Sequence, residues 1–92
     1  MISSGILDTR YKVSLSVRQL AFYIYLNVEA GLVTEQKAKR IHQYVISNFS
    51  TEETEMISEK SFSNGYYSHR AEDIKKVINI LAKMLAIAQE KY

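Results

Sequence analysis

The sequence predicts a mainly α-helical single domain, a compact bundle of three principal helices with one short helix added. Three stretches, 17–30, 35–49 and 69–90, repeat apolar side chains at the three- and four-residue spacing of an amphipathic helix. The chain has no proline and only three glycines, so little interrupts these stretches. Its 92 residues fit one domain, and we expect 1–92 to form it with 1–6 as a flexible tail.

Residues 7–13 alternate apolar and polar side chains, a period of two that is typical of a half-buried strand. A short strand needs a partner, so a flexible segment is the alternative for this region. Residues 61–68 supply the other β signal, because Asn64-Gly65 is the dipeptide most typical of a two-residue hairpin turn. A plain turn between helices explains the dipeptide equally well. A minor β element from these two segments is therefore predicted only as an alternative.

The first predicted helix, 17–30, has marked ends. Ser16 precedes it as an N-cap, and Gln19 three residues later completes the pattern of a capping box. Gly31 follows it, and glycine adopts the left-handed conformation that ends many helices without a steric penalty. We expect Leu32 to fold back as the accompanying hydrophobic contact. Apolar and tyrosyl side chains occupy most sides of this helix, which predicts a place in the core or against another subunit.

Two further helices are predicted in the middle of the chain. Thr34 is a suitable N-cap for the amphipathic helix 35–49. Thr51 precedes a short acidic helix, 52–59, whose first glutamates lie near the positive end of the helix dipole. This segment holds four glutamates and no basic residue, so the rest of a chain with net charge +2 is mildly basic.

The last predicted helix, 69–90, is the longest and most periodic segment of the chain. Ser68 is placed to cap it. Ile80 and Ile87 widen its apolar side. The main apolar stripe of this helix consists of Ile74, Val77, Ile78, Leu81, Met84, Leu85 and Ala88.

The composition argues against several classes of protein. The chain has no cysteine, which excludes disulfides and thiolate metal sites and is consistent with a reducing compartment. No apolar run approaches the length of about 18 residues that crosses a bilayer, so we expect no membrane partner. The first residues lack the basic stretch and apolar run of a signal peptide. We therefore expect a soluble cytoplasmic protein.

Residues capable of catalysis or metal binding are few and dispersed. His42 lies within a predicted helix with no carboxylate three or four positions away. His69 and Asp73 supply two metal ligands without a third. Glu55 and Glu59 are one turn apart, but their polar neighbours predict a solvated surface rather than an acid–base pair. We therefore predict no enzyme activity, no catalytic or metal site and no cofactor.

A regulatory role through binding another protein is the leading hypothesis. Seven tyrosines and three phenylalanines, with two helices apolar beyond one stripe, favour a surface that is buried on association. We expect a homodimer with the first and last long helices as its seams, since a small domain without disulfides gains stability by self-association. An acidic contact for a basic partner, with tyrosine anchors, is predicted at Glu52, Glu53, Glu55, Tyr66 and Tyr67. Charge reversal of these glutamates is expected to weaken binding and leave the fold intact.

Two alternatives remain. The first is a nucleic-acid-binding regulator, winged-helix-like or helical, whose basic helix contacts nucleic acid through Lys37, Lys39, Arg40 and Tyr44. A winged-helix order would make 52–59 the recognition helix, and its four glutamates oppose binding to a polyanion. The second alternative is an oligomeric structural or assembly subunit. The residues match no family signature, so the sequence predicts neither the identity of the partner nor the pathway.

Overall fold

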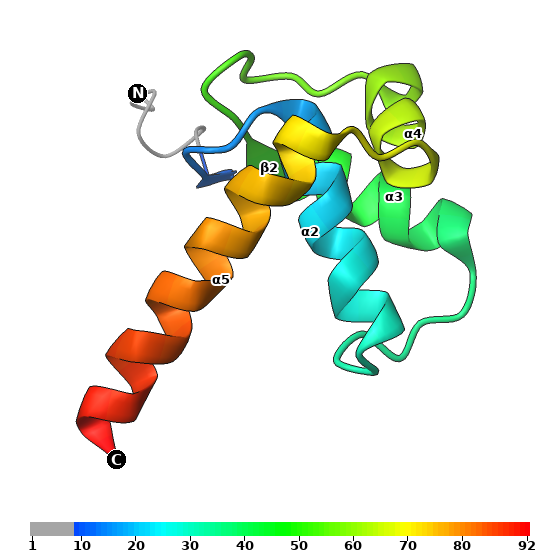
Figure 1. Ribbon diagram of the computed structural model, residues 1–92. Coiled ribbons are helices and arrows are strands. Elements are labelled where there is room, and N and C mark those ends of the chain that lie inside the picture. Colours follow the sequence, from blue (N-terminus) through cyan, green and yellow to red (C-terminus); the bar gives the residue numbers. More distant parts are fainter. Residues whose placement is uncertain (1–8) are drawn as a thin grey trace.

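The computed structural model describes residues 9–92, and the tail expected for 1–6 lies outside them. Four helices and two short strands follow one another along the described chain (Figure 1). They are β1 Tyr11–Lys12, α2 Val17–Glu29, α3 Ala38–Asn48, β2 Phe49–Ser50, α4 Glu59–Tyr67 and α5 Ala71–Lys91. The mainly helical class and the packing of helix on helix are confirmed. α2 is central, because it packs against both α4 and α5.

Both predicted ends of α2 are present. The hydroxyl of Ser16 accepts a hydrogen bond from the Gln19 backbone N–H at 3.2 Å, and the Gln19 side chain accepts one from the Ser16 backbone N–H at 3.0 Å. Gly31 ends the helix with a φ of 83°. The contact predicted for Leu32 is wrong, since this side chain is exposed and Val33 packs against the core instead. The hydrophobic contact therefore comes one residue later than predicted.

α3 begins three residues later than predicted, at Ala38. Thr34 does not cap it, and the residue at the N-cap is Lys37, which makes no side-chain capping bond. The carboxylate of Glu35 accepts a hydrogen bond from the Lys37 backbone N–H at 3.1 Å. Such a local bond from side chain to backbone competes with the first helical turn. At the other end Phe49 has extended backbone and starts β2.

The acidic helix predicted for 52–59 is wrong, because the chain forms turns there until α4 begins. The hydroxyl of Thr51 accepts hydrogen bonds from the backbone N–H groups of Glu53 at 3.2 Å and Thr54 at 3.3 Å. This arrangement offers the backbone an alternative to the helical pattern. The helix starts only after Ser58, whose hydroxyl caps α4.

Residues 61–68 form neither a hairpin nor a plain turn, because Asn64-Gly65 lies inside α4. The close approach of α4 to α2 explains why glycine is found there. A Cβ atom at Gly65 would lie 2.8 Å from the Arg18 Cα and 3.1 Å from the Ala21 Cβ. The side chain of Phe62, one turn earlier, is fully buried against the same core. Tertiary packing thus overrides the local turn preference of the dipeptide.

The minor β element is a two-stranded parallel pair of β1 and β2. Tyr11 lies opposite Phe49, and the two rings meet edge to face with centroids 5.3 Å apart. The strand predicted from the alternation in 7–13 is therefore present at its described end. Its partner is the segment after α3 and not 61–68, which is helical. The pair ties the start of the described chain to the end of α3.

α5 begins at Ala71, after an N-cap at Arg70, and is not capped by Ser68. Only Asp73 and Val77 of this helix are buried, and every residue from 82 onwards is exposed. Most of its apolar stripe therefore lies outside the core. The helix packs on α2 near its N-terminal end and then extends away from the other helices (Figure 1).

The core lies between α2, α3 and α4. The side chains of Leu20, Phe62 and Val77 are the largest that are fully buried. Leu20 and Phe62 belong to one hydrophobic cluster, whose other buried members are Leu15, Val17, Ala21, Ile24, Ile41, Val45, Ile57 and Tyr66.

Candidate interaction surface

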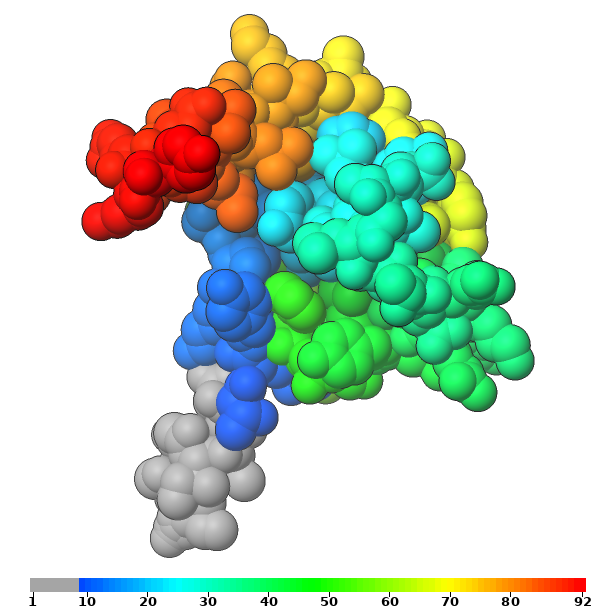
Figure 2. All heavy atoms as spheres, turned by 90° about the horizontal axis from the view of Figure 1, so that it is seen from below, coloured from blue at the N-terminus to red at the C-terminus, as the bar shows by residue number. Residues whose placement is uncertain are grey.

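The second half of α5 carries large apolar side chains into solvent. Exposed fractions are 54% for Ile78, 47% for Met84, 59% for Leu85 and 51% for Ile87. We call residues 78–92 the arm. Figure 2 shows the arm standing away from the body formed by the other helices. An apolar concentration of this kind on a small protein is typical of a contact surface.

The arm is helical because of its composition. Residues 81–88 read LAKMLAIA, in which leucine, alanine, lysine and methionine are strong helix formers. The same segment is apolar on nearly all sides, with Lys83 as its only charged residue. Helices apolar on all sides are ordinarily buried. Local propensity therefore forms this helix, and nothing else within residues 9–92 covers its far end.

A hollow of about 520 Å³ lies beside the arm, between β1, α2 and α5. Its apolar lining includes Leu20 and Tyr23 from α2, and Ile80 and Met84 from α5. The side chain of Met84 thus belongs to both the hollow and the exposed arm. The two features form one continuous apolar surface.

A second hollow of about 520 Å³ lies between the end of α2, α3 and β2. Its lining is almost entirely apolar, with Arg40, Glu35 and Tyr44 as the polar or amphipathic contributors. Arg40 and Glu35 lie 3.9 Å apart as an exposed ion pair. Ion pairs in such positions contribute little to stability.

The acidic residues predicted to bind a partner have different environments. Glu52 and Glu55 are exposed on the turns before α4. The carboxylate of Glu53 accepts a hydrogen bond from the backbone N–H of Val17 at 2.8 Å, so it satisfies an unpaired donor in the first turn of α2. Reversing the charge of Glu53 would therefore disturb the fold, contrary to the expectation that the charge-reversed variant keeps it.

The two predicted tyrosine anchors also differ. The ring of Tyr66 is buried in the core, where it meets Tyr25 edge to face at a centroid distance of 5.6 Å. Burial raises the pKa of the Tyr66 hydroxyl, and the nearby Tyr67, Glu29 and Tyr25 act in the same direction. Tyr67 is 66% exposed. Of the pair, only Tyr67 presents its ring to solvent.

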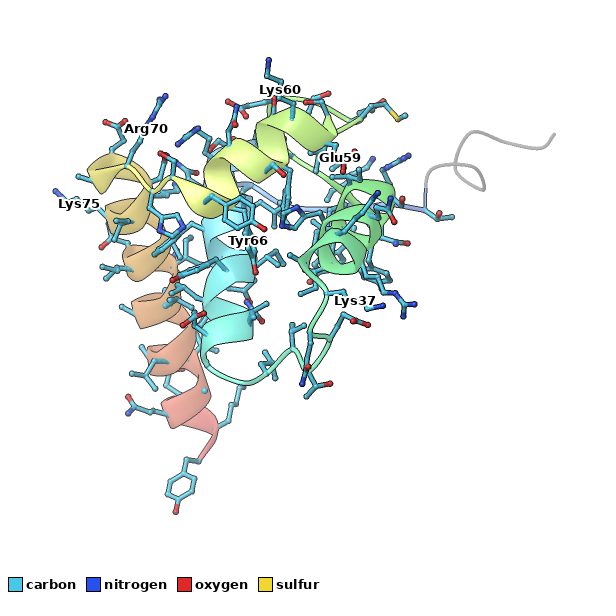
Figure 3. All side chains as sticks on the ribbon, turned by 90° about the vertical axis from the view of Figure 1, so that its right-hand side faces the viewer. Lys37, Glu59, Lys60, Tyr66, Arg70 and Lys75 are labelled. Carbon is cyan, nitrogen blue, oxygen red and sulfur yellow. The ribbon has the colours of Figure 1, made fainter. Side chains whose placement is uncertain are left out.

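The predicted nucleic-acid contacts lie at the N-cap and along the first two turns of α3. Lys37, Lys39, Arg40 and Tyr44 are all exposed. The charge of Arg40 is partly offset by the neighbouring carboxylate of Glu35. Figure 3 places Lys37 on a different side of the molecule from the basic residues Arg70 and Lys75, so these cations do not join into one stripe.

His42 and Ser63 form a pair of a potential base and a potential nucleophile. Their Nδ1 and Oγ atoms are 3.3 Å apart. The imidazole is buried against Phe62 and Tyr66, and its Nε2 atom is buried without a hydrogen-bond partner. Burial lowers the pKa of His42, and the smaller effect of Glu59 raises it. Among residues 9–92, no carboxylate forms a hydrogen bond with this ring as in a catalytic triad, so this arrangement favours a packing role.

The pairing considered for His69 and Asp73 is not formed. The Nε2 atom of His69 lies 2.7 Å from the carbonyl oxygen of Tyr66, and Asp73 lies 3.6 Å from the guanidinium of Arg18. Among residues 9–92, histidines and carboxylates nowhere form a group of three or more that could hold a metal ion. The ring of His69 packs against Phe22 instead.

The sequence offered a partial signal for this surface. The buried position of His42 follows from its place beside Ile41 and one turn before Val45, on the inner face of α3. The excess of apolar residues on the last helix also indicated a contact surface, although not which part of it lies outside the core.

No family model, curated protein or solved structure matches this chain. In the described part of the chain, no helix is both long and apolar enough to span a membrane.

Proposed function

We propose that this chain is a small non-enzymatic regulatory protein of the cytoplasm that acts by binding another protein, and that the arm is its docking surface. One observation carries the proposal, namely that Ile78, Met84, Leu85 and Ile87 are about half exposed on a formed helix. Water-exposed apolar surface of this extent is stabilised when a second protein covers it.

The size of the exposed surface sets the affinity that the arm supplies. Full burial of a leucine, isoleucine or methionine side chain contributes about 1.5–3 kcal/mol. Covering the exposed halves of four such side chains therefore contributes about 3–6 kcal/mol. Association itself costs an estimated 4 kcal/mol or more in lost freedom of motion. A partner must consequently cover more than these four side chains, and the hollow beside the arm extends the same apolar surface.

Nucleic-acid binding is the second candidate. The side chains predicted for this contact are each exposed on α3 or at its N-cap, which favours contact with phosphates and bases; they are Lys37, Lys39, Arg40 and Tyr44. The ion pair of Arg40 with Glu35 and the scattered positions of other cations weaken this candidate. Binding through these residues would decline steeply with salt concentration, because each neutralised phosphate releases counterions.

Affinity capture from the native lysate, with and without nuclease, tests the proposal. The baits are the wild-type chain, L85E in the exposed part of the arm, and A86E as a matched control with the same added charge. We expect the wild type and A86E to retain a stoichiometric protein after nuclease treatment, and L85E to lose it. Equal retention on L85E would show that the arm is not the docking surface. Recovery of nucleic acid, with proteins lost after nuclease, would favour the basic start of α3.

A further inference from the structure

α5 carries two apolar stripes that face different directions. The first faces the body, since Val77 is fully buried, Ile80 packs against the core and Met84 lines the hollow beside α2. The second stripe, which we call the outer seam, lies on the neighbouring side of the helix. Its members are exposed or half-buried, and they are Ile74, Ile78, Leu81, Leu85, Ala88 and Tyr92.

The outer seam has the spacing of a two-stranded coiled coil. Its members alternate between steps of four and three residues along the sequence. A mean step of about 3.5 residues keeps such a stripe at the contact when two helices wrap around each other. Isoleucine and leucine occupy the first four positions, and both pack well in such contacts. The positions that flank the seam between residues 81 and 89 are Ala82, Met84 and Gln89, which carry no charge. Over this stretch two copies of the seam therefore meet without like-charge repulsion beside it.

We propose that the outer seam pairs with the outer seam of a second copy of this chain, so that the two arms form a coiled coil and the protein is a homodimer. This proposal rests on the proposed function, in which the arm is the docking surface. It identifies the protein that docks on the arm as a second copy of this chain. A contact between identical seams closes at two copies by symmetry. Within residues 9–92, the other helices expose only single large apolar side chains, Tyr44 on α3 and Tyr67 on α4, so a second α5 supplies the matching seam.

The length of the seam sets the strength of this dimer. Residues 74–92 measure about 28 Å at 1.5 Å per residue. A specific interface usually covers roughly 800 Å² on each partner, and a seam of this length falls at the low end of that class. We therefore expect a dissociation constant in the micromolar range. Self-association also fits a small chain without cysteine, which has no disulfide to stabilise it.

Sedimentation equilibrium of the purified full chain, over roughly 1–200 µM, tests the homodimer. The wild type is compared with L85E, in the outer seam, and with A86E, which adds the same charge one residue away from it. We expect the wild type and A86E to dimerise with similar affinity. We expect L85E to bind at least about 100-fold more weakly, because the pair would bury two unpaired carboxylates. Circular dichroism shows whether each variant keeps the helical body.

Three results would overturn the homodimer. A wild-type chain that stays monomeric throughout this range has no paired seam. Equal dimerisation of L85E and A86E would place the contact elsewhere. Growth beyond two copies would favour an assembly subunit. A monomeric chain that still captures a different protein through Leu85 would refute the homodimer alone and leave the proposed docking surface standing.

Discussion

Replacing Gly65 with alanine tests the close packing of α4 on α2. A Cβ atom at this position would lie 2.8 Å from the Cα atom of Arg18, which belongs to the backbone of α2, and 3.1 Å from the Cβ atom of Ala21. Neither atom is the end of a flexible side chain, so the two helices must separate. α2 and α4 make the main helix–helix contact of the body, and their separation disturbs the packing around Phe62.

The expected loss of stability is the difference between two opposing effects. Forcing an extra methyl group into a packed contact costs about 1–3 kcal/mol. Replacing glycine by alanine inside a helix contributes about 0.5–1 kcal/mol in the opposite direction. The net free energy of unfolding should therefore fall by at most about 2.5 kcal/mol in G65A, and by about 1 kcal/mol at the middle of the two ranges. For a domain of this size, a loss of about 1 kcal/mol corresponds to a melting temperature lower by about 4–8 °C.

Thermal and urea denaturation followed by circular dichroism measure this loss. N64A is the matched control, because Asn64 is exposed in the same helix and its replacement gains helix propensity without entering the contact. We expect N64A to be as stable as the wild type or slightly more stable. A G65A variant that unfolds at or above the wild-type temperature would refute the steric explanation for glycine at this position.

Three further perturbations test the local contacts. E53A should lower the free energy of unfolding by about 1 kcal/mol, because it removes the carboxylate that accepts a hydrogen bond from the Val17 backbone N–H. E52A should leave the free energy of unfolding unchanged in the same denaturation experiment. S16A should also cost about 1 kcal/mol through loss of the capping box, and an unchanged midpoint would contradict that. Burial lowers the pKa of His42 below its ordinary 6.5, so the unfolded chain takes up a proton first as the pH falls. As the pH falls below about 6.5, the free energy of unfolding of the wild type should therefore decrease more than that of H42Q. Parallel pH profiles would contradict this.

Local sequence signals predicted the features that depend on neighbouring residues. The capping box of Ser16 and Gln19 and the left-handed Gly31 both involve residues within one turn of a helix end. The periodicity of the last segment likewise predicted a long helix, which the structure shows at Ala71–Lys91. These features need no information about distant parts of the chain.

The structural predictions that were wrong have a common physical origin. Asn64-Gly65 favours a turn when isolated, yet burial of Phe62 and Tyr66 on one face of α4 outweighs that preference. The glutamates of 52–59 predicted a helix there, but the hydroxyl of Thr51 accepts hydrogen bonds from two backbone N–H groups of this segment. Glu53 has a structural role for a related reason, since its carboxylate meets the start of α2, 36 positions away in sequence.

The sequence likewise predicted only some features of the candidate surface. The apolar surplus of the last helix, and with it the prediction of a contact surface, followed from periodicity alone. Which apolar side chains are covered did not, because periodicity shows that a side of a helix is apolar and carries no information on what lies against it. Only the position of α2 against the first turns of α5 decided that Val77 is core and Leu85 is exposed. The sequence by itself determined the three principal helices and both ends of α2, because these depend on neighbouring residues. Tertiary packing determined the short helix α4 and which helix faces remain exposed, because these depend on contacts between distant segments.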